Sequence, residues 1–466
     1  MFILNANDSV PLYKQLYNQL RERILSGQLT ADTRLPSVRV LAHELAISRN
    51  TVDGAYQELF AEGYIYSKRN SGYYVSANCH DPAPFPPNLA PYKQQAQLQH
   101  PSGYAYDFHP ARLAPESFPA SHWRKCFSTV LLENPQVMSA YSDPQGELGL
   151  RCSIQHYLET SRGVLCQPEQ IVICAGLQQS LDIVAHLLKG THPSIAIENP
   201  GYHLPRAVFR NHSYDIVPIP VGHNGMDVAI LKASNSAIAY VTPSHQLPLG
   251  CVMPVAQRLN LIEWAEAAGN YILEDDYDSE LRYLGKPLPS LQGLRPGGNI
   301  IYLGTFSKVL SPALRLSYLV LPKSLLAEYR TRFKDYFSTV PLLDQLTLTK
   351  FISMGHWDRH IRRMRTIYKR KHDALVSCIE HTFGSRAEIL GKGAGLHIVV
   401  QFPESVMSET ELLDRASKQG IRLFPFSETL AAGETGPLRI MLGFGGITLA
   451  EIEKSVALLS ACFTPP

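Results

Sequence analysis

The feature that most constrains the possible fold of this chain is a lysine that lies between two apolar runs. In the stretch IYLGTFSKVLSPALRLSYLVLP, residues 301–303 and 316–321 are apolar and strand-like, and the short polar loop between them carries Lys308. Most loop lysines are simply solvated charges, and that interpretation stays open for this stretch alone. The flanking runs nevertheless predict a buried sheet with Lys308 just beyond the end of one strand.

A second apolar run places acidic side chains in a comparable position. Residues 271–273 are apolar, and the residues that follow are Glu274, Asp275, Asp276, Tyr277 and Asp278. Sheets that alternate with helices carry their chemistry where strand meets loop. We therefore expect these side chains and Lys308 to belong to one site.

Together these residues have the chemistry needed to hold pyridoxal 5′-phosphate (PLP). The amine of Lys308 can form a Schiff base, and the carboxylate of Asp275 can keep the pyridine nitrogen protonated, so that the ring withdraws electrons. Thr305 and Ser307 offer hydroxyls and Arg315 a guanidinium close by in the sequence. With backbone amides, these groups suit a phosphate.

The order of these motifs resembles that of fold-type I aminotransferases. EDDYDSELRY, YLGTFSK and SPALRLSYLVLP are similar in particular to the aminotransferase-like domain of MocR-type transcriptional regulators of the GntR family, and the resemblance covers about residues 10–460. It implies an α/β protein in which an N-terminal winged helix-turn-helix precedes a fold-type I PLP-dependent aminotransferase-like domain. It also implies that Lys308 is the Schiff-base residue.

The N-terminal region carries the winged helix-turn-helix pattern. Helices are expected over residues 11–26, from about Ser37, and over residues 49–62, where Ser48 is the expected N-cap; two strand-like runs around a polar turn follow at residues 64–75. The segment RLPSVRVLAHELAISRNTVDGAYQELFAEGYI resembles a GntR-type domain. A small helical module with exposed polar residues is the alternative.

In helix-turn-helix proteins the first residues of the recognition helix contact base edges. Arg49, Asn50 and Thr51 have suitable donors and acceptors, and basic residues nearby suit phosphates or the minor groove. The expected DNA-binding residues are Ser37, Arg39, Ser48, Arg49, Asn50, Thr51, Lys68 and Arg69.

Composition divides the chain into three parts. Repeated prolines punctuate a polar stretch without periodicity, which we interpret as a linker. We expect a winged helix-turn-helix DNA-binding domain over residues 1–76, the Pro-rich linker over residues 77–106 and the PLP-binding effector domain over residues 107–466. A linker of about thirty residues can span several tens of ångströms, so a domain-swapped homodimer is possible, and the resemblance implies one.

The resemblance assigns roles to further residues. Tyr141 would reach the phosphate of the partner subunit's cofactor, and Tyr202 would stack on the ring, with a purely structural tyrosine as the alternative. The turn at Gly176, Leu177 and Gln178 would offer backbone amides to the phosphate, although many strand-to-helix turns look similar. The expected cofactor-binding residues are Tyr141, Gly176, Leu177, Gln178, Tyr202, Asp275, Tyr277, Thr305, Ser307, Lys308 and Arg315.

Two positions bear on the ligand. Where ordinary aminotransferases carry Asn-Pro-Thr-Gly, this chain has Leu247 in place of the asparagine. The hydrogen bond of that asparagine to the cofactor's phenolic oxygen must then fall to Tyr277, Ser244 or His245. Arg439 stands alone among strand-like apolar residues, and a buried arginine needs an anion. The resemblance implies that Arg439 clamps the carboxylate of an amino-acid effector.

Composition limits the class of protein. The chain has 466 residues, 45% hydrophobic and 18% charged, with a formal net charge of +2, as expected for a soluble protein of two or more domains. No run approaches a membrane span, so we expect a cytoplasmic protein without membrane contact. The eight cysteines show no metal-type spacing, and neither zinc nor disulfides are expected.

Two functions remain open. The first is a PLP-dependent transcriptional regulator of the MocR/GntR type that binds a double-stranded DNA operator and senses a small amine, an amino acid or PLP through Lys308. The alternative is an active PLP-dependent aminotransferase with an accessory DNA-binding head. The head and its long linker, which an enzyme would not need, favour the regulator. We expect no metabolic turnover beyond a partial transamination.

Overall fold

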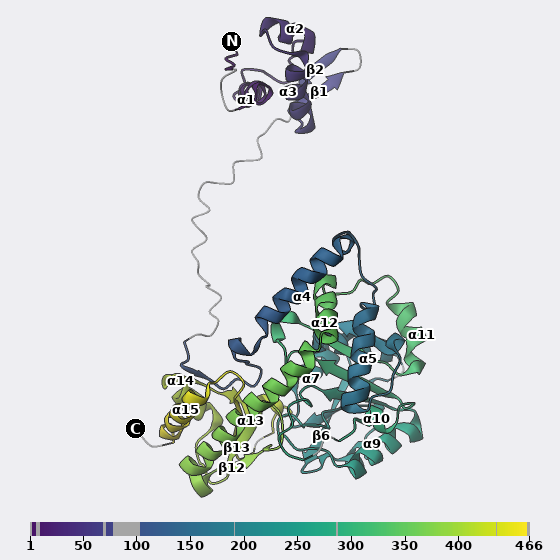
Figure 1. The fold of residues 1–466 in the computed structure, drawn as a ribbon, viewed down its shortest axis with the longest axis vertical. Coiled ribbons are helices and arrows are strands. Elements are labelled where there is room, and N and C mark those ends of the chain that lie inside the picture. The colour runs from purple at the N-terminus through teal and green to yellow at the C-terminus, as the bar shows by residue number, and fades with distance from the viewer. Residues whose placement is uncertain are drawn as a thin grey trace. The chain divides into compact units, whose positions relative to one another are not determined.

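The computed structural model describes residues 2–5, 10–68, 71–77, 103–190, 192–285, 288–434 and 436–463. The chain forms two compact units, Met1–His100 and Pro101–Pro466 (Figure 1). Most of the predicted linker, residues 78–102, and Arg69 of the predicted DNA-binding set lie outside the described residues. Within the described part of the chain, no helix combines the length and apolar character needed to span a membrane.

The N-terminal unit is a small helical bundle with a two-stranded wing. It contains α1 (Leu12–Leu25), α2 (Val38–Glu44) and α3 (Arg49–Ala61), followed by the antiparallel pair β1 (Ile65–Lys68) and β2 (Gly72–Val75). The hydroxyls of Ser37 and Ser48 cap α2 and α3, accepting hydrogen bonds from the backbone N–H groups of Val40 and Thr51 at 3.2 and 3.1 Å. The predicted winged helix-turn-helix is therefore confirmed.

The C-terminal unit is built on a sheet of eight strands in the order β4-β11-β10-β9-β8-β5-β6-β7. The strands are β4 (Ile171–Cys174), β5 (Ser194–Asn199), β6 (Asp215–Gly222), β7 (Gly225–Met226), β8 (Ile238–Val241), β9 (Tyr271–Asp276), β10 (Ile300–Thr305) and β11 (Ser317–Val320). The strands from β10 to β6 are parallel to one another, and β11 is antiparallel to both β10 and β4. The ends of β4, β5, β8, β9 and β10 therefore meet at one edge of the sheet.

Helices cover both faces of this sheet. On one face, apolar residues of α6 (Leu177–Leu188), α7 (His203–Asn211) and α11 (Lys323–Arg332) pack on the strands. The other face is covered by α4 (Ala120–Glu133), α5 (Leu148–Arg162), α8 (Val228–Ala233), α9 (Val255–Ala268), α12 (Leu342–Ser353) and the long α13 (His356–Phe383). Short helices lie at residues Leu291–Leu294 (α10), Pro115–Ser117, Pro135–Ser139, Pro168–Gln170 and Pro312–Leu314.

A smaller antiparallel sheet follows α13. Its order is β12 (Glu388–Leu390), β13 (His397–Phe402), β16 (Leu438–Gly443) and β15 (Phe424–Pro425), and it carries α14 (Glu409–Lys418) and α15 (Leu449–Ala461). The short helices Gly384–Arg386 and Phe426–Thr429 adjoin it. Figure 1 shows α13 running from α12 to this smaller sheet.

The chain enters the C-terminal unit beside the smaller sheet. Strand β3 (Tyr106–Asp107) pairs in parallel with β14 (Ile421–Arg422), so Tyr106, the last residue of the range predicted as linker, already belongs to a strand. The residues that follow lie against glycines of the smaller sheet, since a Cβ on Gly443 would come within 2.5 Å of Pro110 Cα. Residues 106–112, named here the entry segment, are thus closely packed.

Candidate functional site

A cavity of about 360 Å³ lies at the edge of the large sheet where the parallel strands end. The predicted cofactor-binding residues that line it are Leu177, Gln178, Tyr202, Asp275, Tyr277, Thr305, Ser307, Lys308 and Arg315. They come from the start of α6, which follows β4, from the turn after β5, and from the ends of β9 and β10 with the residues that follow them. The parallel strands bring them together from positions well over one hundred residues apart.

Lys308 points into this cavity from the loop after β10. Its Nζ donates a hydrogen bond to the backbone oxygen of Pro110 at 3.3 Å and lies 5.9 Å from the centre of the Tyr277 ring. Burial lowers the pKa of the Lys308 amine, while the charges of Asp278 and Asp275 oppose that shift. A lysine with a lowered pKa spends more time as the free amine, which is the nucleophilic form.

Asp275 presents a carboxylate to the same cavity from the end of β9. It is buried, and the hydroxyl of Tyr240 on β8 donates a hydrogen bond to its Oδ2. Burial raises the pKa of Asp275 to about 7, against the opposing effects of Tyr240 and Lys308. Its charge at neutral pH therefore depends on these neighbours.

A further group of residues at this cavity has the features of an anion site. Gly176, with φ of +86°, directly precedes α6, and a Cβ at this position would lie 2.1 Å from Nη2 of Arg315. The guanidinium of Arg315 therefore occupies space that only a glycine leaves free. Together with the backbone N–H groups at the start of α6 and the hydroxyl of Ser307, it suits a phosphate. The donor set thus fits PLP: an amine, a carboxylate and a phosphate cradle around one cavity.

A buried polar network adjoins the cavity behind Tyr277. The Tyr277 hydroxyl donates to the backbone oxygen of His245 at 2.9 Å, and His245 Nδ1 lies 2.9 Å from Asp278 Oδ2. The hydroxyl of Ser244 instead accepts a hydrogen bond from Arg162 at 2.7 Å. Of the three residues considered for the phenolic oxygen, only Tyr277 lines the cavity.

Three predicted site residues do not line this cavity: Tyr141, Arg439 and Gly176, the last of which lies against Arg315. Tyr141 is 84% exposed, and its ring lies 4.6 Å from that of Phe337. Arg439 on β16 donates to Gln401 Oε1 at 2.7 Å, whereas Met441, two residues further along the strand, lines the cavity. The roles expected for Tyr141 and Arg439 remain predictions, the first because it concerns a partner subunit.

Sequence reasoning missed several residues of the site. His109, Pro110 and Ala111 of the entry segment line the cavity, as do Thr242 and, from the smaller sheet, Phe424. Tyr240 was also missed, because a tyrosine within an apolar strand has the pattern of a core residue. The entry segment has no motif of its own; its position directly after the linker was the only available signal.

The described residues of the predicted DNA-binding set lie on three elements of the N-terminal unit: the start of α2, the start of α3 and the end of β1. Arg49 and Asn50 are exposed at the start of α3, next to the half-buried Thr51, while Arg39 is exposed on α2. Ser37 and Ser48 are occupied as helix caps. Lys68, at the end of β1, lies with Nζ 4.4 Å from the centre of the Tyr74 ring. The first turn of α3 is therefore free to enter a groove.

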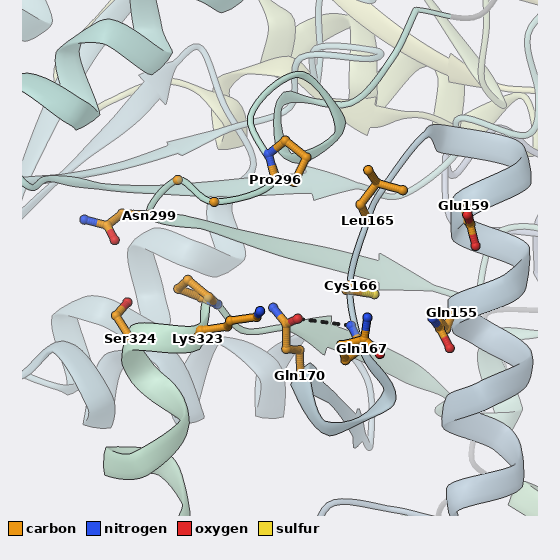
Figure 2. Close-up of a pocket in the computed structure, with 13 residues that line it drawn as sticks. Gln155, Glu159, Leu165, Cys166, Gln167, Gln170, Pro296, Asn299, Lys323 and Ser324 are labelled. Carbon is orange, nitrogen blue, oxygen red and sulfur yellow. Dashed lines mark hydrogen bonds between the residues drawn. The ribbon is translucent and has the colours of Figure 1, made fainter.

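A larger cavity of about 560 Å³ lies at the other edge of the large sheet (Figure 2). Gln170, which precedes β4, and Asn299, which precedes β10, line it together with Lys323 at the start of α11. Most of its polar lining residues are uncharged; Glu159 and Lys323 line it, but no arginine joins them, unlike in the Lys308 cavity. The larger of the two cavities is therefore not the better candidate for the functional site.

Known proteins match both units. Residues 12–75 match the family model "Bacterial regulatory proteins, gntR family", and residues 115–458 match "Aminotransferase class I and II". The chain is 38% identical to the HTH-type transcriptional regulator YhdI of Bacillus subtilis (strain 168), over 99% of this chain and 98% of that one. It is 33% identical to the probable rhizopine catabolism regulatory protein MocR of Rhizobium meliloti, over 99% and 96%.

A solved structure with a similar fold is LysN, the α-aminoadipate aminotransferase of Thermus thermophilus, in complex with N-(5′-phosphopyridoxyl)-L-leucine. The TM-score is 0.70 and the identity 25%, and the match covers 79% of this chain and 95% of LysN. The C-terminal unit therefore has the fold of a PLP-dependent aminotransferase.

Proposed function

Because this chain belongs to the MocR-type subfamily of GntR transcriptional regulators, we propose that it senses a small amine, an amino acid or PLP through a Schiff base on Lys308 and thereby changes its binding to an operator. Residues 1–76 would bind DNA, residues 77–106 would link the domains and residues 107–466 would bind the effector. The convergence of Lys308, Asp275 and Arg315 on one cavity carries the proposal.

Different residues of the cavity would hold different parts of the cofactor. PLP would supply an aldehyde for imine formation and an electron-withdrawing ring. Lys308 offers the amine, Asp275 holds a proton at the ring nitrogen, and Arg315 neutralises phosphate charge with the N–H groups of α6. Tyr202 and Phe424 supply aromatic surface that excludes water from the ring.

The entry segment supports a route from the cavity to the DNA-binding unit. Lys308 donates to the backbone oxygen of Pro110, three residues beyond β3 and directly downstream of the linker. The Lys308 amine that makes this contact is the group that would hold PLP, so bound cofactor would compete with Pro110 for it and an effector amine would return it to Pro110. Each change at Lys308 therefore alters a contact of the segment that continues into the linker.

A homodimer with exchanged DNA-binding units is part of the proposal. The exposed ring of Tyr141 supports it, because this side chain has no place in the cavity of its own chain. In the dimer, Tyr141 would reach the phosphate of the partner subunit's cofactor.

An active aminotransferase is the second candidate. The similarity of the C-terminal unit to LysN favours it, since an α-aminoadipate aminotransferase uses the same fold. The nearly full-length match to transcriptional regulators favours sensing instead.

An absorbance titration of the full-length chain with PLP, and then with amines and amino acids, tests the proposal. We expect a Schiff-base band that one ligand class shifts, with a parallel change in DNA affinity and no accumulation of keto acid. Lys308→Ala should abolish the band. Lys371→Ala is the matched control, because Lys371 is also buried and donates to a backbone oxygen, that of Gly445, at 3.0 Å.

A band that survives in Lys308→Ala would refute the assignment of Lys308. Multiple turnovers with release of a keto acid would instead establish the aminotransferase.

A further inference from the structure

Two neighbouring aspartates at the end of β9 each accept a hydrogen bond from a buried tyrosine of an adjacent strand. Tyr240 on β8 donates to Asp275 Oδ2, and Tyr302 on β10 donates to Asp276 Oδ2 at 2.6 Å. Both tyrosines are almost completely buried. Because successive strand residues point to opposite faces, the two pairs lie on opposite faces of the sheet. Tyr240 belongs to the hydrophobic core that includes α6, and Tyr302 belongs to the core that includes α5.

The two carboxylates differ in the neighbouring charges that stabilise their ionised forms. Asp276 also accepts a hydrogen bond from Arg162 Nε at 2.6 Å and faces away from the Lys308 cavity. Although burial raises the pKa of Asp276, Arg162 and Tyr302 bring it below the ordinary value. Asp275 faces the cavity without an arginine partner among the described residues, and burial raises its pKa to about 7.

Among the groups around Asp275, Tyr240 is the one that favours the ionised carboxylate whatever the state of Lys308. Asp276 and Asp278 act against its ionisation, and Lys308 acts in favour of it. The support from Lys308 changes whenever its amine reacts, whereas the Tyr240 hydroxyl lies in the core and keeps donating. The other ionisable side chains close to this pair are the acid Glu198 and the phenols of Tyr202 and Tyr277.

We propose that Tyr240 is a positioning residue for the cofactor site: its hydroxyl favours the ionised form of Asp275 and holds one carboxylate oxygen, so that the other is presented to the ring nitrogen in the cavity. A hydrogen bond donated to a carboxylate favours the charged form and fixes its orientation. This inference rests on the proposed function, since it assigns Tyr240 a role only if PLP occupies the cavity.

The matched variants Tyr240→Phe and Tyr302→Phe test this role in the full-length protein. Each removes one hydroxyl from a buried tyrosine–aspartate pair, but only the first pair faces the cavity. We expect Tyr240→Phe to weaken PLP binding at pH 7 about tenfold or more, as for loss of a hydrogen bond to a charged group. Tyr302→Phe should leave PLP affinity within about twofold of the unmodified chain, because Arg162 still supports Asp276.

The pH dependence of PLP binding supplies a second readout. The ionised carboxylate is the binding form, so Asp275 contributes more affinity as the pH rises through its pKa of about 7. Loss of the Tyr240 hydroxyl raises that pKa further. PLP affinity is measured by absorbance between about pH 6 and 9. The pH range over which this affinity rises should move to higher pH in Tyr240→Phe and stay unchanged in Tyr302→Phe.

The variant Asp275→Asn shows whether Tyr240→Phe acts through Asp275 or through a general effect on folding. In the Asp275→Asn background, Tyr240→Phe should cause no further loss of PLP affinity, because the group it acts through is gone. An equal loss in both backgrounds, an equal loss in the two tyrosine variants, or an unchanged affinity in Tyr240→Phe would each overturn the inference. Normal PLP binding by the unmodified chain would in those cases leave the proposed function intact, whereas absence of PLP binding by the unmodified chain would overturn both.

Discussion

At the scale of single residues, the space beside Gly176 decides whether the proposed phosphate cradle can form. Its φ of +86° lies in the region that favours glycine, and a Cβ would meet Arg315 Nη2 at 2.1 Å. We expect Gly176→Ala to displace the Arg315 guanidinium and to weaken binding of PLP more than binding of pyridoxal, which lacks the phosphate. Equilibrium titration with both compounds measures the difference.

Gly163→Ala is the control for this prediction. Gly163 also has a positive φ, +70°, but nothing lies within 4 Å of a Cβ built there. It should lower stability by about 1 kcal/mol, as for a strained backbone alone, without changing the ratio of PLP to pyridoxal affinity. A similar ratio in Gly176→Ala would show that Gly176 does not shape the phosphate cradle.

At the scale of elements, the start of α3 is the part of the N-terminal unit that we propose reads DNA. Arg49 is exposed directly after the Ser48 cap. We expect Arg49→Ala to cost about 1–3 kcal/mol of binding to DNA fragments selected by the unmodified protein, as for loss of a bidentate base contact, with PLP uptake unchanged. Equal DNA affinity in a gel-shift or anisotropy titration would remove the recognition-helix assignment.

The entry segment is the element that joins the cavity to the linker. A Cβ on Gly443 of β16 would come within 2.5 Å of Pro110 Cα, so Gly443→Ala should push the segment away from Lys308. We expect the variant to bind PLP and DNA but to lose most of the effector-dependent change in DNA affinity.

Gly436→Ala serves as the control, since nothing lies within 4 Å of a Cβ there. An unchanged effector response in Gly443→Ala, at a melting temperature equal to that of Gly436→Ala, would exclude the entry segment as the route of coupling.

At the scale of the whole molecule, the proposal requires that two chains share each cofactor site. A dimer of one Lys308→Ala chain and one Tyr141→Ala chain would contain one site with both residues intact and one site with neither. Mixing the two inactive variants should therefore restore high-affinity PLP binding to about half of the mixed dimers' sites. Titration of tagged and purified mixed dimers measures this, and no recovery would show that Tyr141 acts within its own chain or not at all.

The sequence alone determined the two-part organisation of the chain and most of the site's chemical groups. Helical periodicity with serine caps predicts the N-terminal unit, and alternating strands and helices place Asp275 and Lys308 beside a sheet edge, because both features depend on local patterns. The resemblance to MocR-type regulators supplied the family, which the comparisons confirmed.

Only the tertiary structure decided which groups meet. Tyr240 has the pattern of a core residue, and the entry segment has no motif, yet the first donates to Asp275 and the second accepts from Lys308. Both contacts join residues more than thirty positions apart, and such contacts depend on strand order and on the packing of the smaller sheet. Local periodicity predicts the elements, but the side chains that tune this site come from the way those elements pack.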